Sequence, residues 1–180
     1  MNLNAMNLFL SEENIKRHLE HLRTQKLKYS ILEKSVHELK GKSIKEILRS
    51  GIKRDIKDEA IKLLLYIRSH EVFFNSFTEL PRKSMNLINN YSSREKFIYD
   101  VYTSSMENDY GFLYVYNDKQ GLTHIAFNKE MDGAFIRYEP ILALDLYEHT
   151  YFADYGFAKD KFLRGALAYF DTGRLILDKT

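Results

Sequence analysis

Asp145 and His149 are the residues whose types and spacing point most directly to chemistry. Asp145 closes the apolar run Pro140–Leu144, and His149 follows it by four residues. A carboxylate at the end of a buried strand is costly unless it is paired, hydrogen-bonded or bound to a metal ion. A strand-to-helix turn of this length can bring both side chains to one point. The spacing therefore indicates a metal site, an Asp–His ion pair or a helix cap.

Further histidines lie on segments with helical periodicity. His70 stands near the end of the most hydrophobic of these segments, and His21 stands eight residues before Tyr29, a little over two helical turns. One Asp and three His suit a redox-active first-row metal or zinc, and their spacing does not choose between them. The chain has no Cys, which excludes disulfides, thiolate zinc sites, iron–sulfur clusters and a Cys nucleophile.

The elements that must position these residues change character along the chain. Apolar spacing and Ser caps predict helices over 11–36, 43–51, 56–77 and 92–106. Aromatic and β-branched runs predict strands over 110–116, 122–127 and 136–146, and the last 25 or so residues return to helix. We expect an α+β fold: an N-terminal helical hairpin, then a small three-stranded antiparallel sheet with flanking helices. The expected division is a helical domain at 1–85 and an α+β domain at 86–180, each with two metal ligands.

Composition excludes several classes of protein. Lys and Arg number 27 against 25 Asp and Glu, so the net charge of +2 does not indicate nucleic-acid binding. A helical nucleic-acid-binding module would use the basic runs at 40–45 and 49–57, but acids and apolar residues interrupt them, which favours solvated helix faces. No apolar run reaches the ~20 residues of a membrane span, and the N-terminus does not resemble a secretory signal. We expect a cytoplasmic protein that binds neither membranes nor nucleic acid.

Four segments together resemble one known family. Residues 145–155 resemble D-x-W-E-H-A-Y-Y-x-D-Y, the signature of the iron/manganese superoxide dismutases. Residues 69–75 resemble that family's N-H-x-F-x-W-N, residues 39–48 its G-K-S-L-E-E-I, and residues 111–114 its G-W-A-W. These segments follow the family's order from about residue 10 to 175. The first motif is specific, whereas each of the others would be weak alone.

The resemblance implies one iron or manganese ion per subunit, held by three His and one Asp, with superoxide as substrate and a homodimer as the assembly. The implied ligands are His21, His70, Asp145 and His149. His21 follows from taking Tyr29 as the family's active-site Tyr, eight residues after the first ligand, where it would gate the channel and orient the proton relay.

An ungapped count back from the Gly41–Ser43 motif gives His18 instead of His21 as the first ligand. It would put Lys26 at the position of the active-site Tyr, so we expect His21. Glu148 resembles the family residue that reaches across the dimer to the partner's ligand; as an acid at a helix start, it could equally be solvated.

The side chains expected around the ligands depart from the family pattern. Gln25 stands where the family has a His, Phe152 replaces the Tyr that pairs with it across the interface, and the family's Gln is missing both at Tyr66 and near 128–130. The chain has 25 Phe and Tyr but no Trp, with Phe or Tyr at the family's Trp positions: Phe74, Phe112, Tyr114 and Tyr147. These departures leave an alternative, a dismutase-like metal-binding or structural protein with little or no activity.

Overall fold

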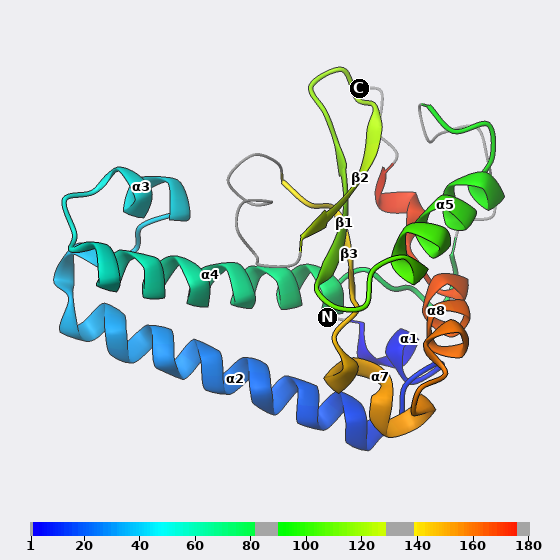
Figure 1. Ribbon diagram of the computed structural model, residues 1–180, viewed down its shortest axis with the longest axis horizontal. Helices are drawn as coiled ribbons and strands as arrows, with labels where there is room; N and C mark the ends of the chain where they lie inside the picture. The colour runs from blue at the N-terminus through cyan, green and yellow to red at the C-terminus, as the bar shows by residue number, and fades with distance from the viewer. Residues whose placement is uncertain (1, 82–89, 129–138, 176–180) are drawn as a thin grey trace.

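A long helical hairpin dominates the first half of the protein. The computed structural model describes residues 2–81, 90–128 and 139–175. A short helix precedes the hairpin, whose two long helices run side by side with two short ones at the far end (Figure 1). These elements are α1 (Leu3–Met6), α2 (Glu12–Ser35), η1 (His37–Leu39), α3 (Ile44–Arg49) and α4 (Arg54–Phe74).

The helix starts expected from Ser residues are confirmed by their capping contacts. Ser11 Oγ accepts a hydrogen bond from the Asn14 amide at the start of α2. Ser43 and Glu46 form a reciprocal capping box at the start of α3. Such caps satisfy amide groups that have no partner within the helix. The local sequence therefore sets where these helices begin, although α4 ends at Phe74, three residues before the expected end.

A three-stranded antiparallel sheet follows, in the order β2-β1-β3. Its strands are β1 (Phe112–Asn117), β2 (Thr123–Asn128) and β3 (Leu142–Asp145). Phe112 pairs with Asp145, so the sheet register itself places the carboxylate beside the start of β1. The third strand was expected over 136–146; its described part is shorter and starts at Leu142, and residues 136–138 lie outside the described residues.

The remaining helices pack at one end of the hairpin (Figure 1). They are α5 (Arg94–Met106), α7 (Glu148–Tyr155), α8 (Lys159–Ala168) and η2 (Thr172–Leu175). Gly156 ends α7 with a φ of 55°, a backbone conformation that favours glycine, and this lets the chain turn into α8. α7 contacts both α2 and α8. These contacts place His149, which lies on α7, against the first half of the chain.

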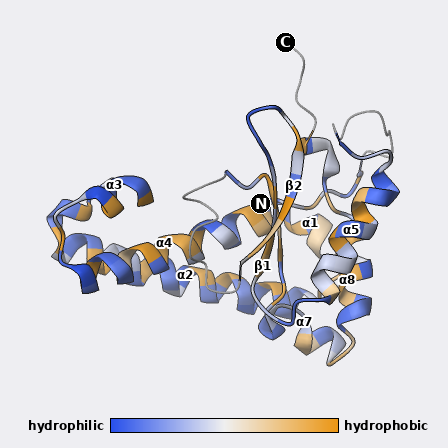
Figure 2. Ribbon diagram, turned by 45° about the horizontal axis from the view of Figure 1, so that its top comes forward, coloured by the Kyte–Doolittle hydropathy of each residue, from blue (hydrophilic) through white to orange (hydrophobic). Residues whose placement is uncertain are grey.

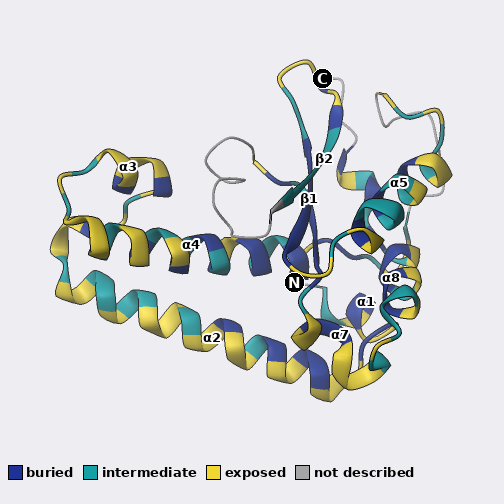
Figure 3. Ribbon diagram, viewed as in Figure 1, coloured by how far each residue is buried: buried dark blue, intermediate teal, exposed yellow. Residues whose placement is uncertain are grey.

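Burial is concentrated where the hairpin meets the sheet. The buried residues of α2 all lie in its first half, and Figure 3 shows the far end of the hairpin largely exposed. Along α2 and α4, hydrophilic and hydrophobic residues alternate (Figure 2), as expected for amphipathic helices. The expected α+β architecture is confirmed.

Two further expectations from the sequence concern membrane-spanning helices and the boundary between domains. In the described part of the chain, no helix has an apolar stretch long enough to cross a membrane. The expected boundary between domains, at residues 85 and 86, lies outside the described residues and stays a prediction.

Candidate metal centre

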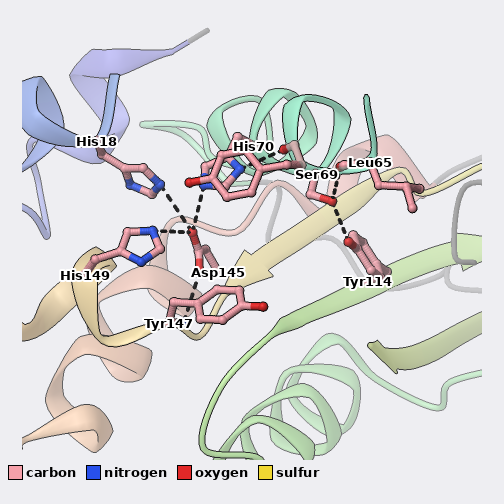
Figure 4. A network of polar contacts seen from close by, with 9 residues as sticks. His18, Leu65, Ser69, His70, Tyr114, Asp145, Tyr147 and His149 are labelled. Carbon is pink, nitrogen blue, oxygen red and sulfur yellow. Dashed lines mark hydrogen bonds and ion pairs between the residues drawn. The ribbon is translucent and has the colours of Figure 1, made fainter. Parts of the chain in front are cut away.

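Four side chains from four different elements converge on one point. They are His18 of α2, His70 of α4, Asp145 at the end of β3 and His149 of α7 (Figure 4). Their potential ligand atoms all lie within 4.8 Å of one another. The side chains of His18, His70 and Asp145 are at most 1% exposed, whereas that of His149 is 42% exposed. Three of the four side chains are thus buried, and that of His149 reaches solvent.

Asp145 lies at the centre of this cluster. Its Oδ2 is 3.2 Å from His18 Nε2, 3.3 Å from His70 Nε2 and 3.5 Å from His149 Nε2. Its other oxygen, Oδ1, accepts a hydrogen bond of 3.0 Å from the Tyr147 amide. This bond fixes the carboxylate, so Oδ2 is left facing the three imidazole rings.

The hydrogen-bonding geometry inside the cluster suits a bound cation. Asp145 Oδ2, His70 Nε2 and both ring nitrogens of His18 are buried and have no hydrogen-bond partner among the described residues, although they are close to one another. His70 Nδ1 lies 2.8 Å from the Tyr66 carbonyl oxygen, which only accepts, so Nδ1 carries a proton and Nε2 is the ring nitrogen that faces the cluster. His70 Nε2 lies 3.3 Å from Asp145 Oδ2. A metal cation between these two atoms would bind both of them.

The acid–base properties of the cluster reflect burial and the central carboxylate. Burial alone would raise the pKa of Asp145, but the contacts with His149, His18 and His70 outweigh it and hold that pKa well below its usual range. Burial lowers the pKa of His18. Burial also acts to lower the pKa of His149, but the contact with Asp145 prevails and raises it. The resting cluster therefore contains an ionised carboxylate and a neutral, buried His18.

Three imidazole nitrogens and one carboxylate oxygen form a donor set that fits a divalent or trivalent first-row metal. Imidazole suits iron and zinc, and a carboxylate suits harder ions such as manganese. The residues present therefore fit the iron or manganese ion expected from the sequence, while the donor set alone does not choose among these metals.

Of the four expected ligands, the structure brings His70, Asp145 and His149 together, and the histidine that joins them is His18 rather than His21. His18 is 3% exposed, whereas His21 lies on the exposed side of α2. The His21 ring centroid lies 5.8 Å from that of His149 and packs edge-on to Tyr66 at 5.3 Å. His21 therefore borders the cluster from outside.

A signal for His18 was present in the sequence. Ile15, His18 and Leu22 are the i, i+3 and i+7 positions of one helix face, and all three are buried. The ungapped count from the Gly41–Ser43 motif pointed the same way. The apolar stripe would have placed His18 toward the core and His21 toward solvent.

Two further expectations, for Tyr29 and Gln25, were counted from His21 and do not hold when the count starts from His18. Tyr29 lies 11 residues after His18, about 16 Å further along the helix axis. Its expected place depended on an eight-residue spacing from His21, and the residue eight after His18 is Lys26, which pairs with Glu71 at 2.7 Å. Gln25 was likewise placed by its distance from His21; the residue four after His18 is the buried Leu22.

Three other expected site residues lie within four residues, in sequence, of one of the clustered side chains. Tyr66 stacks on His70 with ring centroids 4.0 Å apart. Glu148 is exposed at the start of α7, and Phe152 is 44% exposed one turn later, where it packs edge-on against Phe157 at 5.2 Å. The last two form an acidic and aromatic surface beside the exposed ligand His149.

Part of the chain matches the model of a known protein family. The model of the family described as "Iron/manganese superoxide dismutases, C-terminal domain" matches residues 82–171, which is half of the chain. Two of the four clustered side chains, Asp145 and His149, lie inside the matched region. A search of curated proteins finds no match.

Proposed function

Because the chain belongs to the iron/manganese superoxide dismutase family, we propose that it binds one iron or manganese ion per subunit and converts superoxide to dioxygen and hydrogen peroxide. The observation that carries the proposal is the convergence of three imidazoles and one carboxylate within 4.8 Å. His18 and His70 come from the half of the chain outside the matched region, so the ligand set is assembled from both halves.

Two of the proposed ligands, His70 and Asp145, are oriented by hydrogen bonds to the backbone. The Tyr66 carbonyl accepts the Nδ1 proton of His70 and so directs Nε2 into the cluster. The Tyr147 amide does the same for Asp145 by occupying Oδ1. A bound ion would supply the one-electron chemistry, in which one superoxide is oxidised to dioxygen and a second, with two protons, is reduced to hydrogen peroxide. The exposed face at His149 is where the protein would admit substrate and protons.

We also propose that the active form is a homodimer, with a second copy contacting the surface next to His149 and leaving the His149 side of the cluster open. The support is the exposed surface beside that ligand: Glu148, Phe152 and the 89% exposed Phe157. Phe152 has no hydroxyl, so it can contribute apolar contact to such an interface but no hydrogen bond. The cytoplasmic location and a gating role for Tyr29 stay predictions from the sequence.

The test is to purify the protein after growth with iron or with manganese and to measure metal content and superoxide dismutation on the same samples. We expect about one ion per chain, with dismutation that scales with the amount of that ion. Stoichiometric metal with negligible turnover would favour the alternative of a metal-binding or structural relative. Protein without bound metal would contradict both the dismutase and the metal-binding relative, and would leave only a structural role.

The alternative function is favoured by one specific observation. The positions four and eight residues after His18 hold Leu22 and Lys26, an apolar group and a cation that is paired with Glu71. Neither residue offers the imidazole or phenol that the resemblance would place there. Side chains around metal ligands commonly change affinity or activity 10–100-fold, so a low turnover would be understandable.

A further inference from the structure

A groove lies on the opposite side of α4 from the metal centre. It has a volume of about 1230 Å³, and residues of α3, α4, the β1–β2 turn and η2 line it. α3 and the sheet both lie on the side of α4 away from α2 (Figure 1). Arg68 and Val72 of α4 face the groove. His70 is two residues from each of them, a rotation of about 200° around the helix, so it faces away from the groove.

Cationic side chains from four segments of the chain line this groove. They are Lys42, Lys45, Arg68, Lys119 and Arg174. None of the three lysines forms an ion pair with a described residue. Arg174 Nη1 donates a hydrogen bond of 2.6 Å to the Asn75 carbonyl, which is a neutral acceptor and leaves the guanidinium charge uncompensated.

Most of the acidic side chains at the groove are already paired within the protein. Glu71 forms ion pairs with two cations, at 2.7 and 3.5 Å. Asp118 Oδ2 lies 2.7 Å from His124 Nε2, and its Oδ1 accepts from two amides after it in the chain, at 2.9 and 2.8 Å. Of the acids that line the groove, Glu139 alone has no cationic partner among the described residues. Four cations without an acidic partner therefore face one such acid.

The start of α3, which lines the groove, belongs to the most basic segment of the chain. Residues 40–57 contain seven Lys and Arg but two acids. One of these acids, Glu46, is held in the capping box with Ser43. The net charge of +2 for the whole chain thus conceals a concentration of positive charge at this end of the groove.

We propose that this groove binds a single strand of nucleic acid through its phosphates. A strand carries one negative charge on every nucleotide, which suits cations spread over several elements. The groove exceeds the roughly 300–1,000 Å³ of small-molecule pockets, which favours a chain over a small anion. No aromatic side chain is among its described lining residues, so bases have no stacking platform there.

Binding through phosphates alone would not depend on the base sequence. The proposal departs from the expectation drawn from net charge, because the fold gathers cations that the total averages out. It is also independent of the metal centre, since the groove lies across α4 from the clustered side chains.

The experiment measures binding of a labelled single strand of about 20 nucleotides by fluorescence anisotropy between about 50 and 200 mM salt. The groove variant combines Lys42→Gln, Lys45→Gln and Lys119→Gln. The matched control combines Lys16→Gln, Lys28→Gln and Lys161→Gln, three exposed lysines that do not line the groove. Both variants lose three charges, so a loss of general attraction is the same in each.

We expect the groove variant to bind about a hundredfold more weakly at the lowest salt concentration and the control to bind nearly as the wild type does. Each phosphate contact contributes about 0.7 to the slope of log affinity against log salt, so the groove variant should lose about 2 from this slope. Its metal content and thermal midpoint should match those of the wild type, because the substitutions lie on the protein surface away from the cluster.

A wild-type protein that does not bind the strand at the lowest salt concentration overturns the proposal, and so do equal losses in the two variants. Polyglutamate that displaces the strand at an equal concentration of charge assigns the groove to an acidic polypeptide and overturns the proposal as well. A protein that binds the strand but takes up no metal contradicts the proposed dismutase and leaves this inference standing.

Discussion

His18 and His21 lie only three residues apart on α2, but their surroundings differ strongly. One is buried against Asp145 at 3.2 Å, and the other lies on the exposed side of the same helix. Removing a direct ligand costs more than the 10–100-fold in affinity that changing an outer partner costs. We therefore expect His18→Ala to lose stoichiometric metal and His21→Ala to keep it, as measured by elemental analysis after dialysis. The reverse result would restore His21 as the ligand.

The acid–base behaviour of the cluster predicts how metal binding depends on pH. The Asp145 contact raises the pKa of His149, so its proton must leave before the ring can bind a metal. Asp145 and His18 contribute little in this range, because the pKa of each is lowered. Asp145 is therefore already ionised, and His18 is already neutral. Below the raised His149 pKa, affinity should fall roughly tenfold per pH unit. Chelator competition between about pH 5 and pH 8 measures this; an affinity independent of pH would contradict it.

Residue by residue, the sequence indicated three of the four clustered side chains. Asp145 and His149 were recognisable because a short strand-to-helix turn leaves little freedom for residues four apart. His70 was recognisable because a buried imidazole in a strongly apolar helix must either have a hydrogen-bond partner or bind a metal ion. His18 was named only as the alternative to His21, because a long helix carries histidines on more than one face, and packing against α4 and α7 decides which face is buried.

At the level of elements, the contact between α2 and α7 sets the distance between His18 and His149. Asn14 is 3% exposed and donates through Nδ2 to the Thr150 carbonyl and to Asp154 Oδ2, both at 3.0 Å. Asp154 Oδ2 also accepts from the Ser11 amide at 2.8 Å. On α2, Asn14 lies one turn before His18, and on α7, Thr150 directly follows His149. The bonds therefore hold the two histidines in register.

Asn14→Ala is expected to destabilise the protein by about 1–3 kcal/mol, because it leaves the buried Thr150 carbonyl without this donor. Metal affinity should fall with it, since α7 is less firmly held against α2. Denaturant unfolding and metal titration measure the two effects. Arg17→Ala is the control: its ion pair with Glu13 is exposed, and its removal should change stability by less than about 0.5 kcal/mol. Equal effects of the two substitutions would contradict the argument.

Helices and strands were more predictable than their ends. Local signals such as the Ser11 and Ser43 caps act within a few residues, so the starts of α2 and α3 were evident. The described start of β3 at Leu142 depends instead on pairing with Val115 of β1, a partner distant in sequence. The short helix α1 was not expected, because its four residues are too few for a periodic pattern.

At the level of the whole molecule, the exposed aromatic surface beside His149 is the proposed dimer contact. Replacing Phe152 by Ser should shift the protein toward monomer, because the substitution removes apolar area from the contact. Tyr99→Ser is the control, since Tyr99 is 61% exposed on α5. Sedimentation velocity distinguishes the two variants. A wild-type protein that sediments as a monomer, or an equal shift in both variants, would contradict the proposed dimer.

The uneven exposure of the four ligands has a kinetic consequence. Among the described residues, the side chains of His18, His70 and Asp145 are at most 1% exposed, and Asp145 Oδ2 already lies close to the three imidazoles. His149 is the one of the four that reaches solvent, so an ion would enter the folded chain past it. Loading the finished fold is then expected to be slow, whereas a chain that folds with the ion present can close around it. Refolding with and without metal, followed by late addition of metal to the second sample, should show rapid incorporation in the first and slow incorporation in the second.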